Sequence, residues 1–483
     1  MSNFANRFRI RTPYSILGEE GKKRIHEAAL DVMQKTGIRI HSETARASLK
    51  REGAIIAPNG TDVKFPPGLV EELISRAPSK IVLAGRTPEF DLPLDGTHSY
   101  YTTDGCGIQV WDSVKGVRRK SLLEDIRQTA IISDYLPYVS IYEPMVVAQD
   151  VPEKTHVIHG VKVAMENTSK HILTESTTKP GEARAQVKMA SEVVGGVEEL
   201  RKRHYISAMV CTMSPLVLEG PCTEAAMVWA ENHVPVHITG MAQTGISGPA
   251  TIAGDLTVNH AETLALACAM QAHEPGAPCL YGSVLSSLDP VTGSYMGGSP
   301  ESTILCAAAV EMGRYCKMPI STGGLGSGAK VPGTRASMEN ALSAAMCAVA
   351  GGEVVNGLGV IDGSTLLSYE QLLFDNEIAG MTVRIFAGFE ITEETLAVDL
   401  IKKVGIGGTY LSQRHTMTHI RDFYKPLAWG SYVTDELSFT GSGDHVEQAR
   451  TKIGEILKDH TPEPLDLDVR KRLDVVVGEF GKV

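Results

Sequence analysis

The sequence has no long apolar run, no long basic run and no secretory signal. None of its 483 residues belongs to an apolar stretch near the ~18 residues that a membrane span needs. No run of Lys and Arg exceeds three residues, and the net charge is −11 at pH 7, so polyanions are poor candidate ligands. The N-terminal segment lacks the basic stretch and apolar core of a secretory signal. These absences predict a cytoplasmic protein with no membrane and no nucleic-acid partner.

Motifs for disulfides and metals are also missing. The eight cysteines form no C-x-x-C pair and lie in apolar surroundings, so we expect buried free thiols and no structural disulfide. His415 and His419 have i, i+4 spacing on a predicted helix, but no adjacent glutamate and no third ligand accompany them. We therefore expect no metal site and no cofactor held tightly by this chain.

The most glycine-rich stretch, residues 320–340 (ISTGGLGSGAKVPGTRASMEN), lacks two common catalytic motifs. Gly328 is followed by Ala329 and Lys330, which breaks the P-loop pattern, and no G-x-S-x-G nucleophile elbow occurs. Five glycines in eleven residues permit backbone conformations that a Cβ forbids. The pattern fits either a tightly turning loop or the close approach of a ligand to the main chain.

Short β-rich segments alternate with helix-period segments along most of the chain. Eight such segments occur at 99–103, 139–143, 172–176, 206–211, 236–240, 279–283, 318–322 and 354–358. This repeat predicts an α/β fold, a (β/α)8 TIM barrel, with a doubly wound open sheet as the alternative. We expect an N-terminal helical and loop-rich cap at 1–95, the barrel at 96–390 and a C-terminal helical extension at 391–483.

Carboxylates and aromatic rings both fall near predicted strand ends, where TIM barrels hold their chemistry. The carboxylates are Asp104, Glu143, Glu175 and Asp362. A pair of them suits acid–base catalysis or a bound cation, and capping a helix is the alternative for each. The rings are Tyr100, Tyr142, Tyr281, Tyr295 and Phe374. Rings that face one mouth attract a quaternary ammonium ion by cation–π interaction, but ordinary barrel packing explains each ring equally well.

Two longer runs resemble the trimethylamine methyltransferase family. They are MPISTGGLGSGAKVPGTRASMENALSAAMCAVAGGEVVNGLG and YLSQRHTMTHIRDFYKP, and the resemblance extends over nearly the whole chain. Members are barrel enzymes that hand a methyl group to the cobalt of a separate corrinoid protein. The resemblance therefore implies a cognate corrinoid protein as partner and as the source of the cofactor. We also expect a homo-oligomer.

One departure from the family bears on the substrate. Members that act on trimethylamine carry pyrrolysine at what corresponds to Ser337 or an immediate neighbour, whereas residues 333–340 are all standard here. The family's Asp-Ala-Gln-Ala lead-in is replaced by Gly-Thr-Arg-Ala at 333–336. Members without pyrrolysine resemble demethylases of betaine-type quaternary amines. The resemblance thus implies methyl transfer from a quaternary amine, glycine betaine first, with proline betaine or carnitine as alternatives.

This interpretation assigns a role to each candidate residue. Glu143, Glu175 and Ser337 are the catalytic candidates, the two carboxylates adding charge and Ser337 bordering the pocket. The substrate-binding candidates are the five rings as a cage, Lys330, Arg335 or His415 for a substrate carboxylate, and Gly323, Gly324 and Asn356 around the pocket. Two rival functions are a Schiff-base aldolase or lyase that uses Lys330 and a non-catalytic subunit that docks the corrinoid protein.

Overall fold

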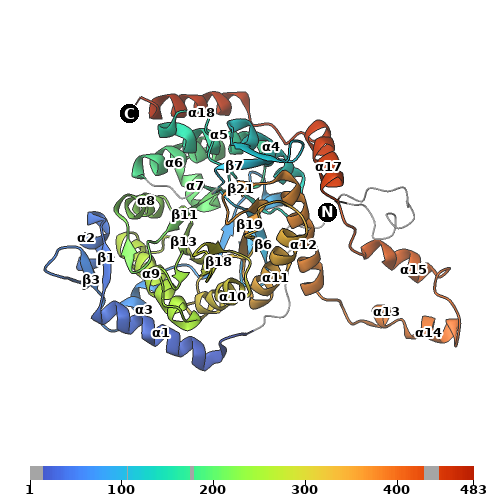
Figure 1. Cartoon of the computed structure of the whole chain (residues 1–483), viewed down its shortest axis with the longest axis horizontal. Helices are drawn as coiled ribbons and strands as arrows, with labels where there is room; N and C mark the ends of the chain where they lie inside the picture. The colour runs from blue at the N-terminus through green and yellow to red at the C-terminus, as the bar shows by residue number, and fades with distance from the viewer. Residues whose placement is uncertain (1–14, 106, 175–178, 429–444, 483) are drawn as a thin grey trace.

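Eight parallel strands close into a barrel at the centre of a computed structural model of the chain (Figure 1). The structure describes residues 15–105, 107–174, 179–428 and 445–482. In barrel order the strands are β6 (Tyr100–Thr103), β9 (Ile141–Tyr142), β10 (His171–Thr174), β11 (Ile206–Cys211), β13 (Val236–Gly240), β15 (Cys279–Ser283), β18 (Ile320–Gly323) and β19 (Val354–Leu358). Each strand overlaps one of the eight predicted segments. Because β19 pairs with β6, the sheet is closed and the TIM barrel prediction is confirmed.

Helices follow every barrel strand and cover the outside of the barrel. They are α4 (Leu123–Tyr135), α5 (His156–Asn167), α6 (Pro180–Val194), α7 (Val197–Arg203), α8 (Gly220–Glu231), α9 (Ile252–His273), α10 (Pro300–Tyr315), α11 (Thr334–Ala350) and α12 (Tyr369–Phe386). Since the strands are covered on both faces, they are buried almost throughout. This burial explains why their sequences show short apolar runs and no regular alternation.

The N-terminal residues form a cap that packs against α9. The cap contains α1 (Gly18–Lys35), α2 (Glu43–Arg51), α3 (Leu69–Ile74), β1 (Ile38–Ile40), β2 (Ile55–Ile56), β3 (Asp62–Lys64), β4 (Ile81–Leu83), η2 (Pro88–Phe90) and β5 (Leu92–Leu94). Helix α9 contacts α1, α2 and α3 on one side and barrel strands on the other, so it is apolar and buried nearly all round. A sheet in the order β12-β1-β3-β2 joins the cap to β12 (Val217–Leu218), a feature that the expected helical and loop-rich cap did not include.

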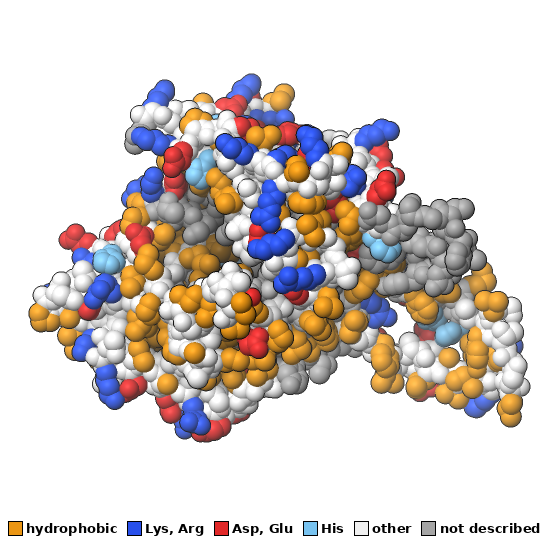
Figure 2. All heavy atoms as spheres, viewed as in Figure 1, with side chains coloured by type: hydrophobic (Ala, Val, Ile, Leu, Met, Phe, Trp, Pro, Cys, Tyr) orange, Lys and Arg blue, Asp and Glu red, His pale blue; other side chains and the backbone are white. Residues whose placement is uncertain are grey.

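The C-terminal residues divide into an arm and two packed helices. The arm, residues 391–422, contains α13 (Glu393–Leu396), α14 (Val398–Val404), α15 (Arg414–His419) and η4 (Ile420–Asp422) and leads away from the barrel (Figure 1). Many of its apolar side chains are exposed (Figure 2). Helix α17 (His445–Asp459) packs on α12 and α4, and α18 (Leu467–Phe480) packs on α6 and α5. No helix in the described ranges is long and apolar enough to cross a membrane.

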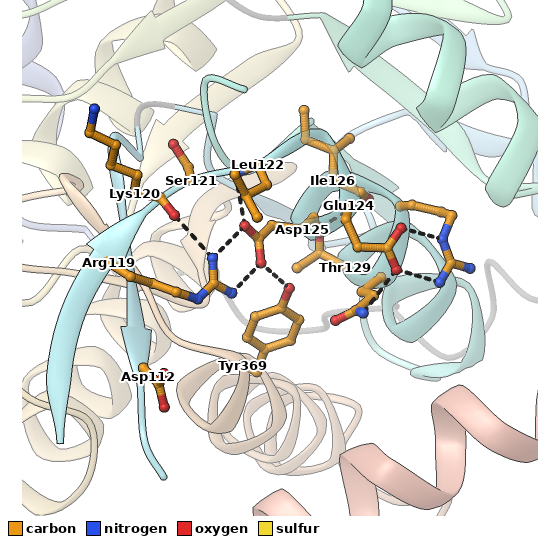
Figure 3. Close-up of polar contacts among 12 residues, drawn as sticks. Asp112, Arg119, Lys120, Ser121, Leu122, Glu124, Asp125, Ile126, Thr129 and Tyr369 are labelled. Atoms are coloured by element: carbon orange, nitrogen blue, oxygen red, sulfur yellow. Dashed lines mark hydrogen bonds and ion pairs between the residues drawn. The ribbon is translucent and has the colours of Figure 1, made fainter. Parts of the chain in front are cut away.

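Short strands and one 3-10 helix lie in the loops between the barrel strands and the helices. They are β7 (Gln109–Asp112), β8 (Val117–Lys120), η3 (Glu153–Thr155), β14 (Gln243–Thr244), β16 (Ser286–Leu288), β17 (Tyr295–Met296), β20 (Val360–Ile361) and β21 (Leu366–Leu367). The hairpin β7–β8 is held to the start of α4 and α12 by one buried carboxylate, Asp125 (Figure 3). Arg119 donates to both oxygens of Asp125, and the Tyr369 hydroxyl donates to Oδ1 at 2.7 Å. This cluster fixes the loop that follows β6.

A candidate active site at the C-terminal ends of the strands

A cavity lies over four adjacent strands, β15, β18, β19 and β6, at their C-terminal ends. It contains about 450 Å³ of empty space, part of which is open to solvent. Its lining residues are Asp104, Val284, Leu285, Tyr295, Gly297, Gly298, Ser302, Thr303, Cys306, Gly323, Gly324, Leu325, Gly326, Ser343, Cys347, Asn356 and Ser364. This is the end of a TIM barrel where active sites are built, so the cavity is the candidate active site.

The glycine-rich stretch forms one wall of this cavity, and two of its contacts require glycine. A Cβ on Gly324 would lie 2.4 Å from Cγ1 of Val355, and a Cβ on Gly297 in the facing loop would lie 1.9 Å from the Gly326 carbonyl oxygen. The Cys347 thiol donates to the Gly323 carbonyl at 3.1 Å. The glycines therefore allow close packing of main chain at the cavity wall.

Side chains from α11 and α12 hold this wall in place. The Gly326 N–H donates to Oδ1 of Asn340 at 3.1 Å, and Nδ2 of Asn340 donates to Asp375 at 2.9 Å. Asp375 also accepts from Gln371 and from the N–H of Gly359, both at 2.8 Å. Burial raises the pKa of Asp375 to about 6, although the three hydrogen bonds act in the opposite direction. The wall is thus anchored to a buried polar network behind it.

The lining combines one carboxylate, one aromatic ring, small polar side chains and the aliphatic side chains of Val284, Leu285 and Leu325. Asp104 follows β6, and Tyr295 enters from β17. Asn356 on β19 donates through Nδ2 to Ser321 at 3.2 Å, and its Oδ1 has no hydrogen-bond partner in the described parts of the chain. None of the described lining residues is Lys, Arg or His. The described lining residues therefore present a carboxylate and other oxygen and sulfur atoms to a ligand, and none of them is cationic.

None of the three predicted catalytic residues is among the described residues that line the cavity. Glu143 is buried at the end of β9, where its carboxylate lies beside Gly105, and it is not among the residues that line the cavity. Ser337 lies on α11 outside the cavity lining, and Gln371 donates to its hydroxyl at 3.5 Å. The structure therefore does not place Ser337 in the lining of this cavity, because the first turn of α11 faces α12. Glu175 lies outside the described residues.

Of the five rings predicted to form an aromatic cage, only Tyr295 lines the cavity. The hydroxyl of Tyr142 donates to the Ile126 carbonyl at 2.9 Å and contacts Thr129, so the ring points outward to α4. Tyr281 likewise points outward, with its hydroxyl 2.9 Å from Nδ1 of His260 on α9. Tyr100 reaches back toward Pro93, to whose carbonyl it donates at 3.3 Å. The expectation that these three rings face the mouth is wrong, because they fill the space around the strands.

Phe374 and the predicted carboxylate-binding residues also lie away from the cavity. Phe374 is buried in the hydrophobic core on α12. Lys330 forms an ion pair with Asp362, and Nε of Arg335 contacts Glu339 at 2.7 Å. His415 lies on the arm, with its ring 4.3 Å from that of His419. Gly323, Gly324 and Asn356 line the cavity, and their role in substrate binding stays a prediction.

Asp362 serves the loop structure rather than the cavity. Burial acts to raise its pKa, but hydrogen bonds from Lys330 and Arg118 outweigh burial and lower it. Lys330, which makes this ion pair, is not among the residues that line the cavity. This arrangement disfavours the alternative in which Lys330 is a Schiff-base nucleophile.

Comparison with known proteins agrees with this architecture. A family model described as trimethylamine methyltransferase (MTTB) matches residues 2–478. The chain belongs to the trimethylamine methyltransferase family. It is 31% identical over 455 residues to trimethylamine methyltransferase MttB of Desulfitobacterium hafniense (strain DSM 10664 / DCB-2), covering 94% of this chain and 92% of that protein. It is 27% identical over 481 residues to a glycine betaine methyltransferase of Desulfitobacterium hafniense (strain Y51), covering 97% and 98%.

A solved structure shares the fold of this family member. The crystal structure of the Methanosarcina barkeri monomethylamine methyltransferase (MtmB) aligns with a TM-score of 0.52 at 12% identity, over 94% of this chain and 90% of that one. Family membership confirms the resemblance drawn from the two sequence runs. It also establishes the chain as a methyltransferase that acts on methylated amines.

Sequence reasoning missed several residues of this methyltransferase cavity. Cys306 and Cys347 were expected only as buried free thiols, and nothing in the sequence singled out Thr303 or Ser343. In the structure Thr303 and Ser343 contact each other at 2.7 Å, one from α10 and one from α11. Thr303 and Cys306 lie near the start of α10, whereas Ser343 lies in the middle of α11 and Cys347 toward its end, so no shared position along the two helices signals the lining.

Within the described ranges, one group of potential metal ligands converges, and it lies far from the cavity. His26, His260 and Cys316 bring their ligand atoms within 4.8 Å of one another. They come from α1, α9 and the residue after α10, toward the N-terminal ends of the strands. The cysteines of the described ranges are all free thiols.

Proposed function

We propose that this family member transfers a methyl group from a quaternary amine, glycine betaine first, to the cobalt of a cognate corrinoid protein. The observation that carries the proposal is the charge of the cavity: Asp104 lines it, and no described Lys, Arg or His does. A permanent cation suits such a lining, because the carboxylate attracts it and none of the described lining residues carries a positive charge that would repel it. The relative named as a glycine betaine methyltransferase supports this substrate class.

The proposed reaction requires little acid–base catalysis by the residues of this chain. In the transfer, a nucleophile attacks the methyl carbon in line with the C–N bond, and the electron pair of that bond stays on nitrogen. The nitrogen loses its positive charge and departs as a neutral tertiary amine, so no proton donor is needed. The corrinoid cobalt of the partner supplies the nucleophile. The residues of this chain would bind the cation and aim one methyl group toward the open side of the cavity.

Tyr295 and Asp104 would share the recognition of the ammonium group. An aromatic ring contributes ~0.5–2 kcal/mol to binding a desolvated cation, and the carboxylate adds Coulomb attraction. A substrate carboxylate would have to be bound by neutral donors, because Lys330, Arg335 and His415 lie elsewhere. Backbone N–H groups of the glycine-rich wall are donors of this kind.

The direct test compares methyl donors. The purified chain is mixed with its reduced corrinoid partner and with glycine betaine, proline betaine, carnitine or trimethylamine, and the demethylated amine is measured by NMR. We expect product from at least one betaine and little from trimethylamine. A rate with trimethylamine equal to that with every betaine would overturn the substrate assignment, while no transfer from any methylated amine would overturn the proposal itself.

A pair of tyrosine variants tests the cation site. Tyr295→Leu should lower kcat/KM for a quaternary amine about 2- to 30-fold, the range that corresponds to ~0.5–2 kcal/mol of cation–π energy. Tyr135→Leu, on the surface end of α4, is the matched control and should leave kcat/KM unchanged. Equal activity of the two variants would remove Tyr295 from the site. Asp104→Asn should also raise KM, because it removes the only carboxylate among the described lining residues.

A further inference from the structure

A cluster of two buried histidines, His26 and His260, and the half-buried Cys316 lies where the N-terminal cap meets the barrel. The three ligand atoms lie within 4.8 Å of one another, and Nδ1 of His26 is 2.9 Å from Nε2 of His260. His26 comes from the cap helix α1, His260 from α9, and Cys316 ends α10. Nothing in the methyl-transfer chemistry requires these side chains, because the cavity lies at the opposite ends of the strands.

The outer nitrogen of each imidazole also has a partner. Nδ1 of His260 lies 2.9 Å from the Tyr281 hydroxyl, and Nε2 of His26 lies 3.9 Å from the Glu71 carboxylate. Histidines that bind metal usually donate their other N–H to an oxygen, which fixes the ring and the tautomer. The nitrogens that remain, Nδ1 of His26 and Nε2 of His260, are the two that face each other. Both rings are thus oriented as metal ligands would be.

We propose that His26, His260 and Cys316 bind a structural Zn²⁺ ion that ties the N-terminal cap to the barrel. Two nitrogens and one sulfur are a ligand set that zinc favours, with a water molecule in the fourth position. Bond lengths of about 2.0 Å place two nitrogen ligands about 3.3 Å apart in a tetrahedron. The two imidazoles need to separate by only about 0.4 Å from their present 2.9 Å.

Burial and access are both compatible with a bound ion. Both imidazoles are buried, and the neutral imidazole is the form of histidine that binds metal. On coordination the Cys316 thiol loses its proton to solvent. The Glu71 side chain is 48% exposed and marks the side from which an ion enters.

A purely structural explanation exists for the same geometry. Tyr281, His260 and His26 can form a chain of hydrogen bonds with no ion present, and the Glu71 carboxylate lies 3.9 Å beyond its end. The two explanations differ in one residue. The hydrogen-bond chain does not use Cys316, whereas zinc coordination does.

Cobalt substitution of the intact chain distinguishes these explanations. The purified protein is stripped with a chelator and titrated with Co²⁺ alone, then with Zn²⁺ as competitor. We expect one ion per chain and a near-ultraviolet thiolate-to-cobalt charge-transfer band that Zn²⁺ removes. Absence of the band, or metal content well below one ion per chain after incubation with Zn²⁺, overturns the proposal in favour of the hydrogen-bond chain.

Three variants give the ligand assignment its own test. Cys316→Ser should abolish the charge-transfer band, and Tyr281→Phe should weaken metal binding about 10- to 100-fold, as expected for an outer-shell partner. Cys222→Ser, a partly exposed cysteine on α8, is the matched control and should keep both the band and the affinity. A band that persists in Cys316→Ser overturns the proposed site. Metal removal should also lower the melting temperature of the unmodified chain but not that of Cys316→Ser.

Discussion

Nδ2 of Asn340 donates a hydrogen bond to Oδ1 of Asp375 at 2.9 Å, and both side chains are fully buried between α11 and α12. Through its own Oδ1, Asn340 also accepts from the Gly326 N–H at the cavity wall. The ionisation state of Asp375 is therefore linked to the position of that wall. Its pKa is raised by burial to about 6, from an ordinary value of 3.8.

The first prediction concerns the pH dependence of folding stability. The folded state holds the proton of Asp375 more tightly than the unfolded state, so the contribution of this group to stability falls as pH rises from about 4 to about 6. Two pKa units correspond to about 3 kcal/mol at most. The unfolding free energy should be measured across this range for the natural chain and for Asp375→Asn. As pH rises from about 4 to about 6, the free energy of the natural chain should fall relative to that of the variant.

Other buried carboxylates do not interfere with this measurement. Asp255 and Glu353 also have raised pKa values, of about 6 and about 7, but they are present in both proteins and cancel in the difference. A difference between the two proteins that stays constant from pH 4 to pH 7 would contradict the raised pKa of Asp375.

A second prediction uses two glycines of the same wall. A Cβ on Gly324 would lie 2.4 Å from Val355, whereas a Cβ on Gly328 would meet nothing closer than 3.6 Å. Gly324→Ala should therefore destabilise the fold by ~1–3 kcal/mol, as overpacking does, and should slow methyl transfer. Gly328→Ala is the matched control, and its free energy of unfolding should stay within about 0.5 kcal/mol of that of the natural chain. Denaturant titration of the two variants checks this prediction. Equal stabilities would show that the cavity wall can move to make room for a Cβ at Gly324.

The sequence predicted the barrel because each strand is a short apolar run followed by a helix-period segment. It could not predict which way the strand side chains point. In a barrel covered by helices both faces of a strand are buried, so apolar and aromatic residues occur on either face. Tyr142 and Tyr281 illustrate this limit, since both lie on correctly predicted strands and both point outward.

Other site residues were hidden by distance along the chain. His26 and His260 are 234 positions apart, and only the docking of α1 on α9 brings them together. The cavity residues Thr303 and Ser343 carry no motif of their own and become neighbours because β15 and β18 are adjacent. Glycine at 323 and 324 was the exception, because a local cluster of glycines is visible without knowing the fold.

A third prediction compares Arg119, which is labelled in Figure 3, with Arg127 on α4. Arg119 binds the buried Asp125, while Arg127 binds the exposed Glu124 on the same helix. Arg119→Ala should lower the free energy of unfolding by about 1.5–3 kcal/mol, because a buried carboxylate loses its charged hydrogen-bond donor. Arg127→Ala should cost less than about 0.5 kcal/mol, since exposed ion pairs contribute little. Thermal or denaturant unfolding checks the contrast, and similar losses for both variants would contradict it.

The fourth prediction concerns the arm, residues 391–422, and the expected homo-oligomer. Its helices are only four, seven and six residues long, too short to be stable in water by themselves. Ile406 and Leu411 are exposed, as are other apolar residues along the arm (Figure 2). Such a segment gains stability by packing against another surface, and we expect that surface to belong to a second copy of the chain.

Light scattering after size-exclusion chromatography tests this expectation. The natural chain should have at least twice the mass of one chain, and the double variant Ile406→Asp, Leu411→Asp should shift toward a single chain, because burying two carboxylates in an apolar contact is costly. Val114→Asp, at an exposed position of the β7–β8 hairpin outside the arm, should leave the mass unchanged. A natural chain with the mass of one copy, or a double variant with an unaltered mass, would show that the arm does not join copies of this protein.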